Sequence, residues 1–242
     1  MTQTEIDFVR RLSALGLTLT EDQLAGFRTY YENLTEWNRV MNLTAITGEE
    51  DVYTKHFLDC LSLVRIVSRE TLQGKRMIDV GTGAGFPGLV LAIAFPEMEV
   101  VLMDSLNKRI RFLDDTAEKL GLSNVRTIHA RAEELARDKR HRETYDLCCS
   151  RAVASAAVLS EYCLPFIRKG GLFAAYKSEK AEQELEEGKR AIQILGGKVE
   201  RTESFVLPET DYGRTLVLIR KVKETPGRYP RKAGTPAKDP IR

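Results

Sequence analysis

The sequence predicts an α/β protein with a doubly wound, mostly parallel sheet that is preceded by helices. From about residue 75 onward, short apolar runs alternate with helical patterns, which is the element order of a doubly wound sheet. The last two runs are joined by the short polar connection 208–213, so they form a hairpin. A closing hairpin brings an antiparallel last strand into the sheet. We therefore expect a mostly parallel sheet of seven strands.

Residues 1–70 show helical rather than strand periodicity. The motif Thr20-x-x-Gln23 is a capping box and marks the start of a helix whose apolar stripe includes Phe27 and Leu34. We expect an N-terminal helical subdomain over 1–70, a ligand-binding domain over 71–222 and a basic C-terminal tail over 223–242. The expected strands are Met77 to Val80, Glu99 to Met103, Val125 to His129, Tyr145 to Cys149, Leu172 to Lys177, Lys198 to Leu207 and Thr215 to Val222.

The first strand is followed by glycines at alternate positions, Gly81-x-Gly83-x-Gly85. Glycine accepts positive φ and, without a Cβ, lets the backbone approach a nucleoside. Because Gly83-x-Gly85-x-x-Gly88 also matches the dinucleotide fingerprint, an NAD-dependent oxidoreductase is one interpretation. S-adenosylmethionine (SAM) is favoured, because Gly81 is the glycine that opens the turn. Asp79 lies two residues before it, inside the end of the strand, where an acid is typical of sites for this cationic ligand. The predicted fold is thus the class I SAM-dependent methyltransferase (Rossmann-like) fold.

Candidate site residues follow the predicted strands, because ligands of open parallel sheets lie at the carboxyl ends of the strands. An acid after the second strand suits the ribose hydroxyls, and the start of the helix after the third strand suits the adenine edge. A first-turn acid favoured by the helix dipole is the alternative for Glu133, core packing is the alternative for Phe86, and a surface ion pair is the alternative for Arg151. The expected cofactor-binding residues are Gly81, Gly83, Phe86, Asp104, Ala132, Glu133 and Arg151.

Two further groups of reactive side chains carry weaker predictions. His56 and Asp59 lie one helical turn apart and could form an acid/base pair, but with no visible partner a polar pair at a helix surface or an interface is favoured. The four cysteines have no ligand spacing, so we expect reduced thiols, a cytoplasmic protein and no metal. No apolar stretch approaches membrane-spanning length, which argues against a membrane partner.

The charge is unevenly distributed along the chain. The formal net charge is +2, but residues 221–242 contain seven Lys or Arg and two Asp or Glu, hence +5, which leaves −3 on the other 220 residues. A basic end on a mildly acidic body suggests a polyanionic partner. A solvated, disordered tail is an equally good interpretation of composition alone.

Several motifs together resemble the ribosomal RNA small subunit methyltransferase G family, formerly called glucose-inhibited division protein B. The resemblance extends from about residue 30 to the C-terminus. The motifs are Trp37-Asn38, Asn42-Leu43-Thr44-Ala45-Ile46, His56-x-x-Asp59, the segment from Asp79 to Gly88, Asp104-Ser105-x-x-Lys108-Arg109, Ser150-Arg151-Ala152 and Tyr229-Pro230-Arg231-Lys232-x-Gly234-Thr235-Pro236.

The resemblance implies a bacterial, cytoplasmic enzyme that transfers a methyl group from SAM to nitrogen 7 of a guanine in 16S rRNA, in a loop near the decoding centre. It also implies that Gly81, Phe86, Ala132, Glu133 and Arg151 contact the cofactor, and that 16S rRNA or the small ribosomal subunit is the partner. Because this nitrogen loses no proton, we expect positioning without a catalytic acid or base. We expect a monomer. The alternatives are an RNA-binding ribosome assembly factor with a vestigial fold and the NAD-dependent oxidoreductase.

Overall fold

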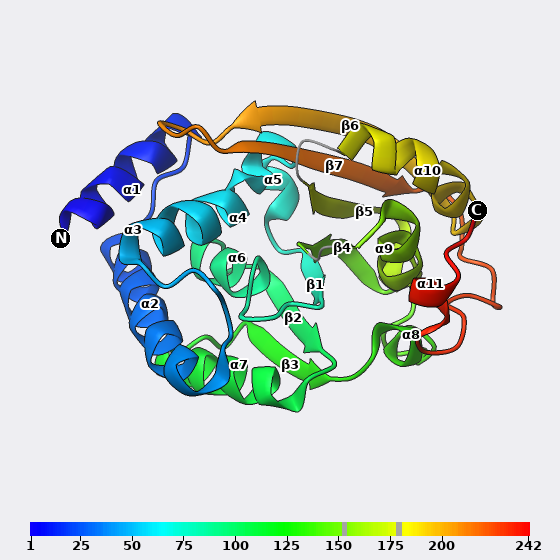
Figure 1. Ribbon diagram of the computed structural model, residues 1–242, viewed down its shortest axis with the longest axis horizontal. Coiled ribbons are helices and arrows are strands. Elements are labelled where there is room, and N and C mark those ends of the chain that lie inside the picture. The colour runs from blue at the N-terminus through cyan, green and yellow to red at the C-terminus, as the bar shows by residue number, and fades with distance from the viewer. Residues whose placement is uncertain (152–153, 178–180) are drawn as a thin grey trace.

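The computed structural model describes residues 1–151, 154–177 and 181–242, and these form one sheet with helices on both faces (Figure 1). The seven strands are arranged in the order β3-β2-β1-β4-β5-β7-β6. The strands are β1 (Arg76–Val80), β2 (Glu99–Asp104), β3 (Val125–His129), β4 (Tyr145–Ser150), β5 (Ile167–Lys177), β6 (Gly197–Val206) and β7 (Gly213–Lys221).

The pairing confirms the predicted sheet. β1 to β5 are mutually parallel, whereas β7 is antiparallel to both β5 and β6. Most strand boundaries lie within two residues of the prediction, and the largest difference is that β5 begins at Ile167 rather than at Leu172. The strand runs through Gly170, which has a φ of +87°, and through Gly171. The strand order reverses next to β1, and this reversal creates the crevice in which open α/β sheets bind ligands.

Two separate cores cover the two faces of the sheet. One face packs against the N-terminal helices together with α6 and α7, and the other packs against α8, α9, α10 and the C-terminal segment (Figure 1). The α-helices are α1 (Gln3–Ala14), α2 (Glu21–Met41), α3 (Glu49–Val52), α4 (Asp59–Leu61), α5 (Arg69–Leu72), α6 (Gly88–Ala94), α7 (Asn107–Lys119), α8 (Ala132–Leu135), α9 (Ala156–Cys163), α10 (Ala181–Ile194) and α11 (Thr235–Lys238). The π-helical turn Tyr53–Leu58 joins α3 to α4, and 3-10 turns occupy Ser62–Arg65 and Leu164–Phe166.

The N-terminal helices are joined to the sheet by an aromatic cluster. Both α1 and α2 begin with complete capping boxes, at Thr2 and at the predicted Thr20. Phe57 lies 5.0 Å from the ring of Phe27 and 5.2 Å from the ring of Tyr30, measured between ring centroids. Large buried rings contribute strongly to packing energy, so this cluster holds the π-helical turn against α6 and the glycine turn that precedes it.

The C-terminal segment, residues 223–242, folds back onto the sheet domain. Tyr229 and Ile241 are buried in the second core. The Arg231 guanidinium donates from Nε to Oε1 and from Nη2 to Oε2 of Glu161, which is fully buried. A buried carboxylate without its cation would be costly, so this ion pair anchors the segment. These residues therefore do not form a solvated, disordered tail.

Among the residues that the structure describes, no helix combines the length and the apolar character that crossing a bilayer requires. The same residues contain no cluster of three or more His, Cys, Asp or Glu that could hold a metal ion.

Candidate functional site

The turn after β1 depends on glycine and on one buried carboxylate. Gly81, Gly83 and Gly85 have φ angles of +73°, +63° and +93°, which are strained for side chains with a Cβ. Asp79 Oδ2 accepts hydrogen bonds from the Thr82 hydroxyl at 2.7 Å and from the Gly88 amide at 2.8 Å. Asp79 is fully buried, so its carboxylate stabilises the turn through these hydrogen bonds and does not face the ligand.

Burial also changes the chemistry of this carboxyl. Asp79 Oδ1 has no hydrogen-bond partner among the described residues. Desolvation raises the pKa of Asp79 to about 6, against the opposing effect of the two hydrogen bonds to Oδ2. The proton is thus held more tightly in the folded protein than in the unfolded chain.

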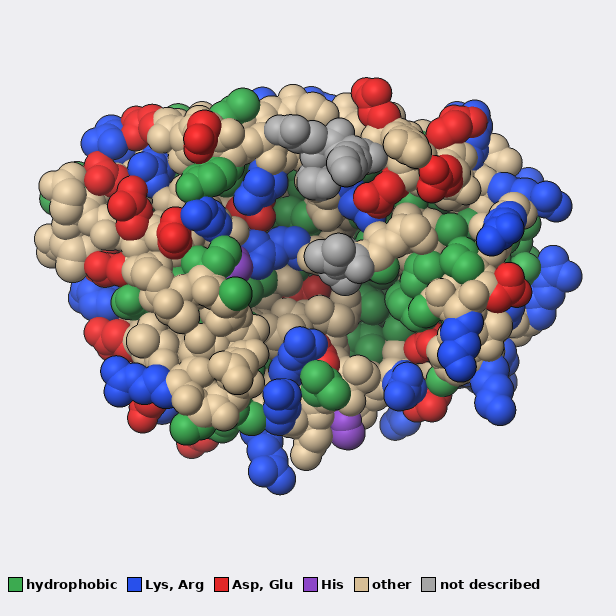
Figure 2. Space-filling model, in the orientation of Figure 1, with side chains coloured by type: hydrophobic (Ala, Val, Ile, Leu, Met, Phe, Trp, Pro, Cys, Tyr) green, Lys and Arg blue, Asp and Glu red, His purple; other side chains and the backbone are tan. Residues whose placement is uncertain are grey.

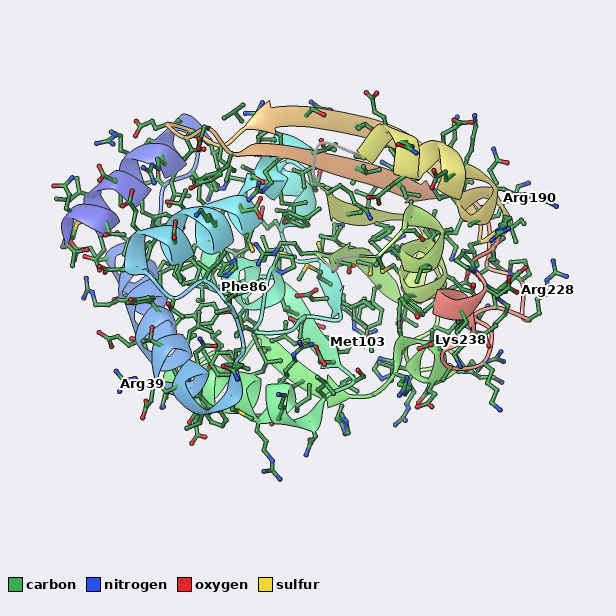
Figure 3. The ribbon with its side chains drawn as sticks, in the orientation of Figure 1. Arg39, Phe86, Met103, Arg190, Arg228 and Lys238 are labelled. Atoms are coloured by element: carbon green, nitrogen blue, oxygen red, sulfur yellow. The ribbon has the colours of Figure 1, made fainter. Side chains whose placement is uncertain are left out.

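A cavity of about 310 Å³ opens at the carboxyl ends of β1, β2 and β3, and we call it the nucleoside cavity. This volume is within the range of about 300–1,000 Å³ that small-molecule sites occupy. A Cβ built on Gly81 or on Gly83 would meet no atom within 4 Å, so the backbone of the turn faces open space. The lining residues are Val80, Gly81, Met103, Asp104, Ser105, Ala130, Arg131, Ala132, Glu133, Ala154, Leu159, Tyr162, Gly234 and Ala237. Figure 3 shows Met103 near the centre of the molecule, at this end of the sheet.

The two carboxylates of the nucleoside cavity are held by different partners. Asp104 accepts from the amides of Gly83 and Leu106 and from Arg109 Nη1, at 3.0, 2.9 and 3.0 Å. A carboxylate has about four acceptor sites, so one remains for a ligand hydroxyl. Glu133 Oε1 accepts from the Gly234 amide at 2.7 Å, so the C-terminal segment forms one wall of the cavity.

A second cavity, of about 330 Å³, lies beside the glycine turn, and we call it the cationic cavity. Figure 2 shows Lys and Arg side chains gathered in a hollow near the centre of the face in view. The cationic cavity is lined by Ile46, Lys55, His56, Asp59, Arg151, Tyr176, Lys177 and Arg214. These residues come from the N-terminal helices and from the ends of β4, β5 and β7, which only the tertiary fold brings together.

The environment of His56 identifies its charge state. Arg151 Nη2 lies 2.8 Å from His56 Nδ1, and Thr44 Oγ1 lies 3.0 Å from Nε2. Because a guanidinium can only donate, Nδ1 accepts, and the ring proton is therefore on Nε2 and donated to Thr44. Burial and the neighbouring Arg151 lower the pKa of His56 to about 3. The imidazole is neutral at physiological pH and is a poor general base.

The sequence favoured a polar pair of His56 and Asp59 at a helix surface or an interface, and the structure contradicts this prediction. Both are buried, with 7% and 4% of their surfaces exposed. Asp59 Oδ2 accepts from Arg151 Nη1, and Oδ1 accepts from Arg214 Nε, both at 3.0 Å. The partner that the sequence did not reveal is Arg151, which is 92 residues from Asp59 in the chain. The ion pair between Arg151 and Asp59 is therefore not at the surface, contrary to the alternative interpretation of Arg151.

Phe86 lies in the wall between the turn and the cationic cavity. Its ring stacks on His56 at 4.3 Å between centroids, and the Arg151 guanidinium lies 5.1 Å from the ring centroid. Phe86 is 6% exposed and belongs to the first core (Figure 3). Its ring thus orients the side chains that line the cavity.

The structure places the predicted site residues in two groups. The nucleoside cavity is lined by Gly81, Asp104, Ala132 and Glu133, and the Gly83 amide donates a hydrogen bond to Asp104. Arg151 lines the cationic cavity, and Phe86 packs against Arg151. Ala152, which belongs to one of the motifs, lies outside the described residues. Sequence reasoning missed Lys55 and Arg214. No local pattern marks either residue, although Lys55 directly precedes the motif His56-x-x-Asp59 and Arg214 directly follows the connection 208–213.

Two neighbouring buried cysteines, Cys148 and Cys149, are held as protonated thiols. Cys60, Cys148, Cys149 and Cys163 are free and buried. Burial raises the pKa values of the Cys148 and Cys149 thiols, so both remain protonated and pack as small apolar groups.

The fold and the site together define a class of protein. A nucleoside cavity over a glycine turn, next to an arginine that can hold a carboxylate, fits adenosine joined to a methionine group. A solved structure with this architecture is M. jannaschii TYW2 in complex with AdoMet, at a TM-score of 0.51 and 16% identity, over 67% of this chain and 74% of that one. The TrmN structure from Thermus thermophilus gives a TM-score of 0.52 at 17% identity, over 70% and 53% of the two chains. The protein thus has the class I fold of SAM-dependent methyltransferases.

The family follows from sequence similarity over nearly the whole chain. A family model described as "GidB: rRNA small subunit methyltransferase G" matches residues 23–212. Ribosomal RNA small subunit methyltransferase G of Lachnoclostridium phytofermentans is 52% identical over 97% of this chain and 96% of its own length. The protein of the same name from Listeria monocytogenes is 50% identical over 97% and 98%. The chain belongs to the rRNA small subunit methyltransferase G family, as its motifs predicted.

Proposed function

We propose that the protein transfers the methyl group of SAM to nitrogen 7 of a guanine in a loop of 16S rRNA near the decoding centre. The observation that carries the proposal is the nucleoside cavity, which adjoins a cationic cavity in a chain of this family. The first cavity suits the cofactor, and the second has the charge that an RNA strand requires.

Each predicted cofactor-binding residue has a role in this proposal. Asp104 accepts a ribose hydroxyl, and the backbone of Ala132 with the Glu133 side chain borders the adenine edge. Gly81 and Gly83 let the backbone approach the nucleoside, because space is open above them. Arg151 binds the carboxylate of the methionine group, and Phe86 holds the guanidinium in place through its ring face.

Catalysis in this proposal needs no acid or base. SAM supplies an electrophilic methyl group, and guanine nitrogen 7 has a lone pair and no proton to lose. His56 supports this mechanism because it is neutral and both ring nitrogens are hydrogen-bonded within the protein. The protein then accelerates transfer mainly by orienting the two substrates and by excluding water.

The C-terminal segment contributes to binding RNA. Its exposed cations are Lys223, Arg228, Lys232, Lys238 and Arg242. Figure 3 shows Arg228 and Lys238 at the edge of the molecule where the chain ends. Because Gly234 and Ala237 of the same segment line the nucleoside cavity, RNA bound here lies close to the cofactor. We also propose that the protein is a cytoplasmic monomer; its four reduced cysteines and its ribosomal substrate support the compartment.

Methyl transfer to ribosomal subunits tests this function. Small subunits from a strain that lacks the gene would be incubated with the protein and radiolabelled SAM, with wild-type subunits and deproteinised 16S rRNA as controls. We expect label only in unmodified substrate, released as 7-methylguanine on hydrolysis. RNA binding without label would favour the assembly factor. Thermal stabilisation by NAD instead of SAM would favour the oxidoreductase.

A further inference from the structure

Asp59 holds two arginines at a fixed separation, and only one of them has a role so far. Its two carboxylate oxygens each accept one guanidinium, from Arg151 on one side and from Arg214 on the other. Arg151 is directed toward Phe86 and the glycine turn. Arg214 comes from the start of β7, and its guanidinium lies 6.0 Å from the ring centroid of Tyr212.

The charges around the cationic cavity do not cancel among the described residues. Lys55 pairs with Asp51 at 2.8 Å, and Lys177 pairs with Glu184 at 2.7 Å. The two arginines share the single carboxylate of Asp59, and His56 is neutral. The cationic cavity therefore keeps one net positive charge that can attract an anionic ligand.

Of the two arginines bound to Asp59, Arg214 is the more exposed. The Arg214 side chain is 28% exposed and that of Arg151 is 19% exposed. A planar guanidinium binds a phosphate through two parallel hydrogen bonds, and phosphate contacts set the position of a nucleic-acid strand.

We propose that Arg214 binds a backbone phosphate of the RNA strand beside the nucleotide that receives the methyl group, so that the cationic cavity is the site of the acceptor nucleotide. This inference rests on the proposed function. Asp59 is then a positioning residue, because it ties the arginine that serves the cofactor to the arginine that serves the RNA. Such a link fixes the geometry between methyl donor and acceptor, on which proximity catalysis depends.

The test compares Arg214→Ala with Arg220→Ala, a matched change on the same strand. Arg220 pairs with Glu200 and lies outside the cavity. Affinity for unmodified small subunits would be measured across salt concentrations, and SAM affinity would be measured by calorimetry. For Arg214→Ala we expect the log–log salt slope to fall by about 0.7–0.9, as for one lost phosphate contact. We expect the RNA KM to rise about tenfold, with SAM affinity unchanged. Arg220→Ala should change none of these.

Arg214→Lys keeps a cation beside Asp59 and serves if the alanine variant does not fold. We expect its salt slope to match the wild type, while its RNA KM rises several-fold because the fork is lost. An unchanged RNA KM in either folded variant would overturn the inference, as would weaker SAM binding with an intact salt slope. Failure of the proposed function is a separate result, because wild-type protein would then leave ribosomal subunits unlabelled.

Discussion

The nucleoside cavity and the cationic cavity adjoin the same glycine turn, yet they are built in different ways. The first is lined mainly by residues that directly follow β1, β2 and β3, which parallel pairing brings to one edge. The second combines the π-helical turn Tyr53–Leu58 with residues at the ends of β4, β5 and β7. The comparison teaches that sheet topology places the ligand groups of the first cavity, while helix packing places those of the second.

The largest expected effect comes from Arg151, the residue of the cationic cavity that lies against Phe86 of the glycine turn. Arg151→Ala removes the cation facing the turn and leaves Asp59 and His56 with one partner fewer. We expect kcat/KM for methyl transfer to fall about 100-fold to 1,000-fold, as when a buried charged donor is lost. The control is Arg168→Ala, which removes an exposed pair with Asp146. Similar losses in both variants would contradict the assignment.

The next prediction concerns pH, because Asp79 in the glycine turn and His56 in the cationic cavity should affect stability in opposite directions as pH changes. Asp79 has a raised pKa of about 6, so its contribution to stability falls as pH rises from about 4 to about 6. His56 has a lowered pKa of about 3, so its contribution rises with pH between about 3 and 6.5. The two contributions oppose each other, and each amounts to at most a few kcal/mol.

Two variants would reveal these opposing contributions. Asp79→Asn should make the unfolding free energy rise more steeply between pH 4 and pH 6, by up to about 3 kcal/mol over that range. His56→Asn keeps an acceptor for Arg151 and should make the unfolding free energy rise less steeply with pH over the same range, because the rising contribution of His56 is removed. Urea unfolding at pH 4, 5 and 6 measures both, and parallel curves for the variants and the wild type would refute the buried charge states.

Two glycines of the turn should respond differently to alanine. At Gly88 a Cβ would press on the Leu102 side chain and lie 2.9 Å from Asp79 Oδ2, so Gly88→Ala should cost about 1–3 kcal/mol of stability. At Gly81 nothing lies within 4 Å, and the strain of a positive φ costs about 1–2 kcal/mol. Gly81→Ala should instead lower SAM affinity, because the methyl group enters the nucleoside cavity. Calorimetric SAM binding and thermal melting distinguish the two effects.

The smallest expected effect concerns the exposed cations of the C-terminal segment. Lys238→Ala should lower the salt slope of RNA binding by about 0.7–0.9 and leave SAM affinity unchanged. Lys189→Ala is the control, because this exposed lysine on α10 pairs with Glu186 away from both cavities. Equal slopes for the two variants would remove the C-terminal segment from the RNA surface.

More of the fold than of the site could be predicted from the sequence. Alternating apolar runs and the hairpin connection predicted the mostly parallel sheet and its antiparallel last strand, because these depend on local periodicity and chain connectivity. The end of β5 was placed correctly and its start was not, because the exposed Arg168 and Lys169 interrupt the apolar run in the first half of the strand. The buried partners of His56 could not be predicted, because Arg151 is 95 residues away.

The sequence by itself determined the sheet, the glycine turn and the family, since each is encoded in a short run of residues whose chemistry is local. Only the tertiary structure decided that Asp59 lies between Arg151 and Arg214, and that the C-terminal segment closes the nucleoside cavity through Gly234 and Glu133. The physical reason is that a buried charge without a partner is costly, and the packing of distant elements supplies the partners.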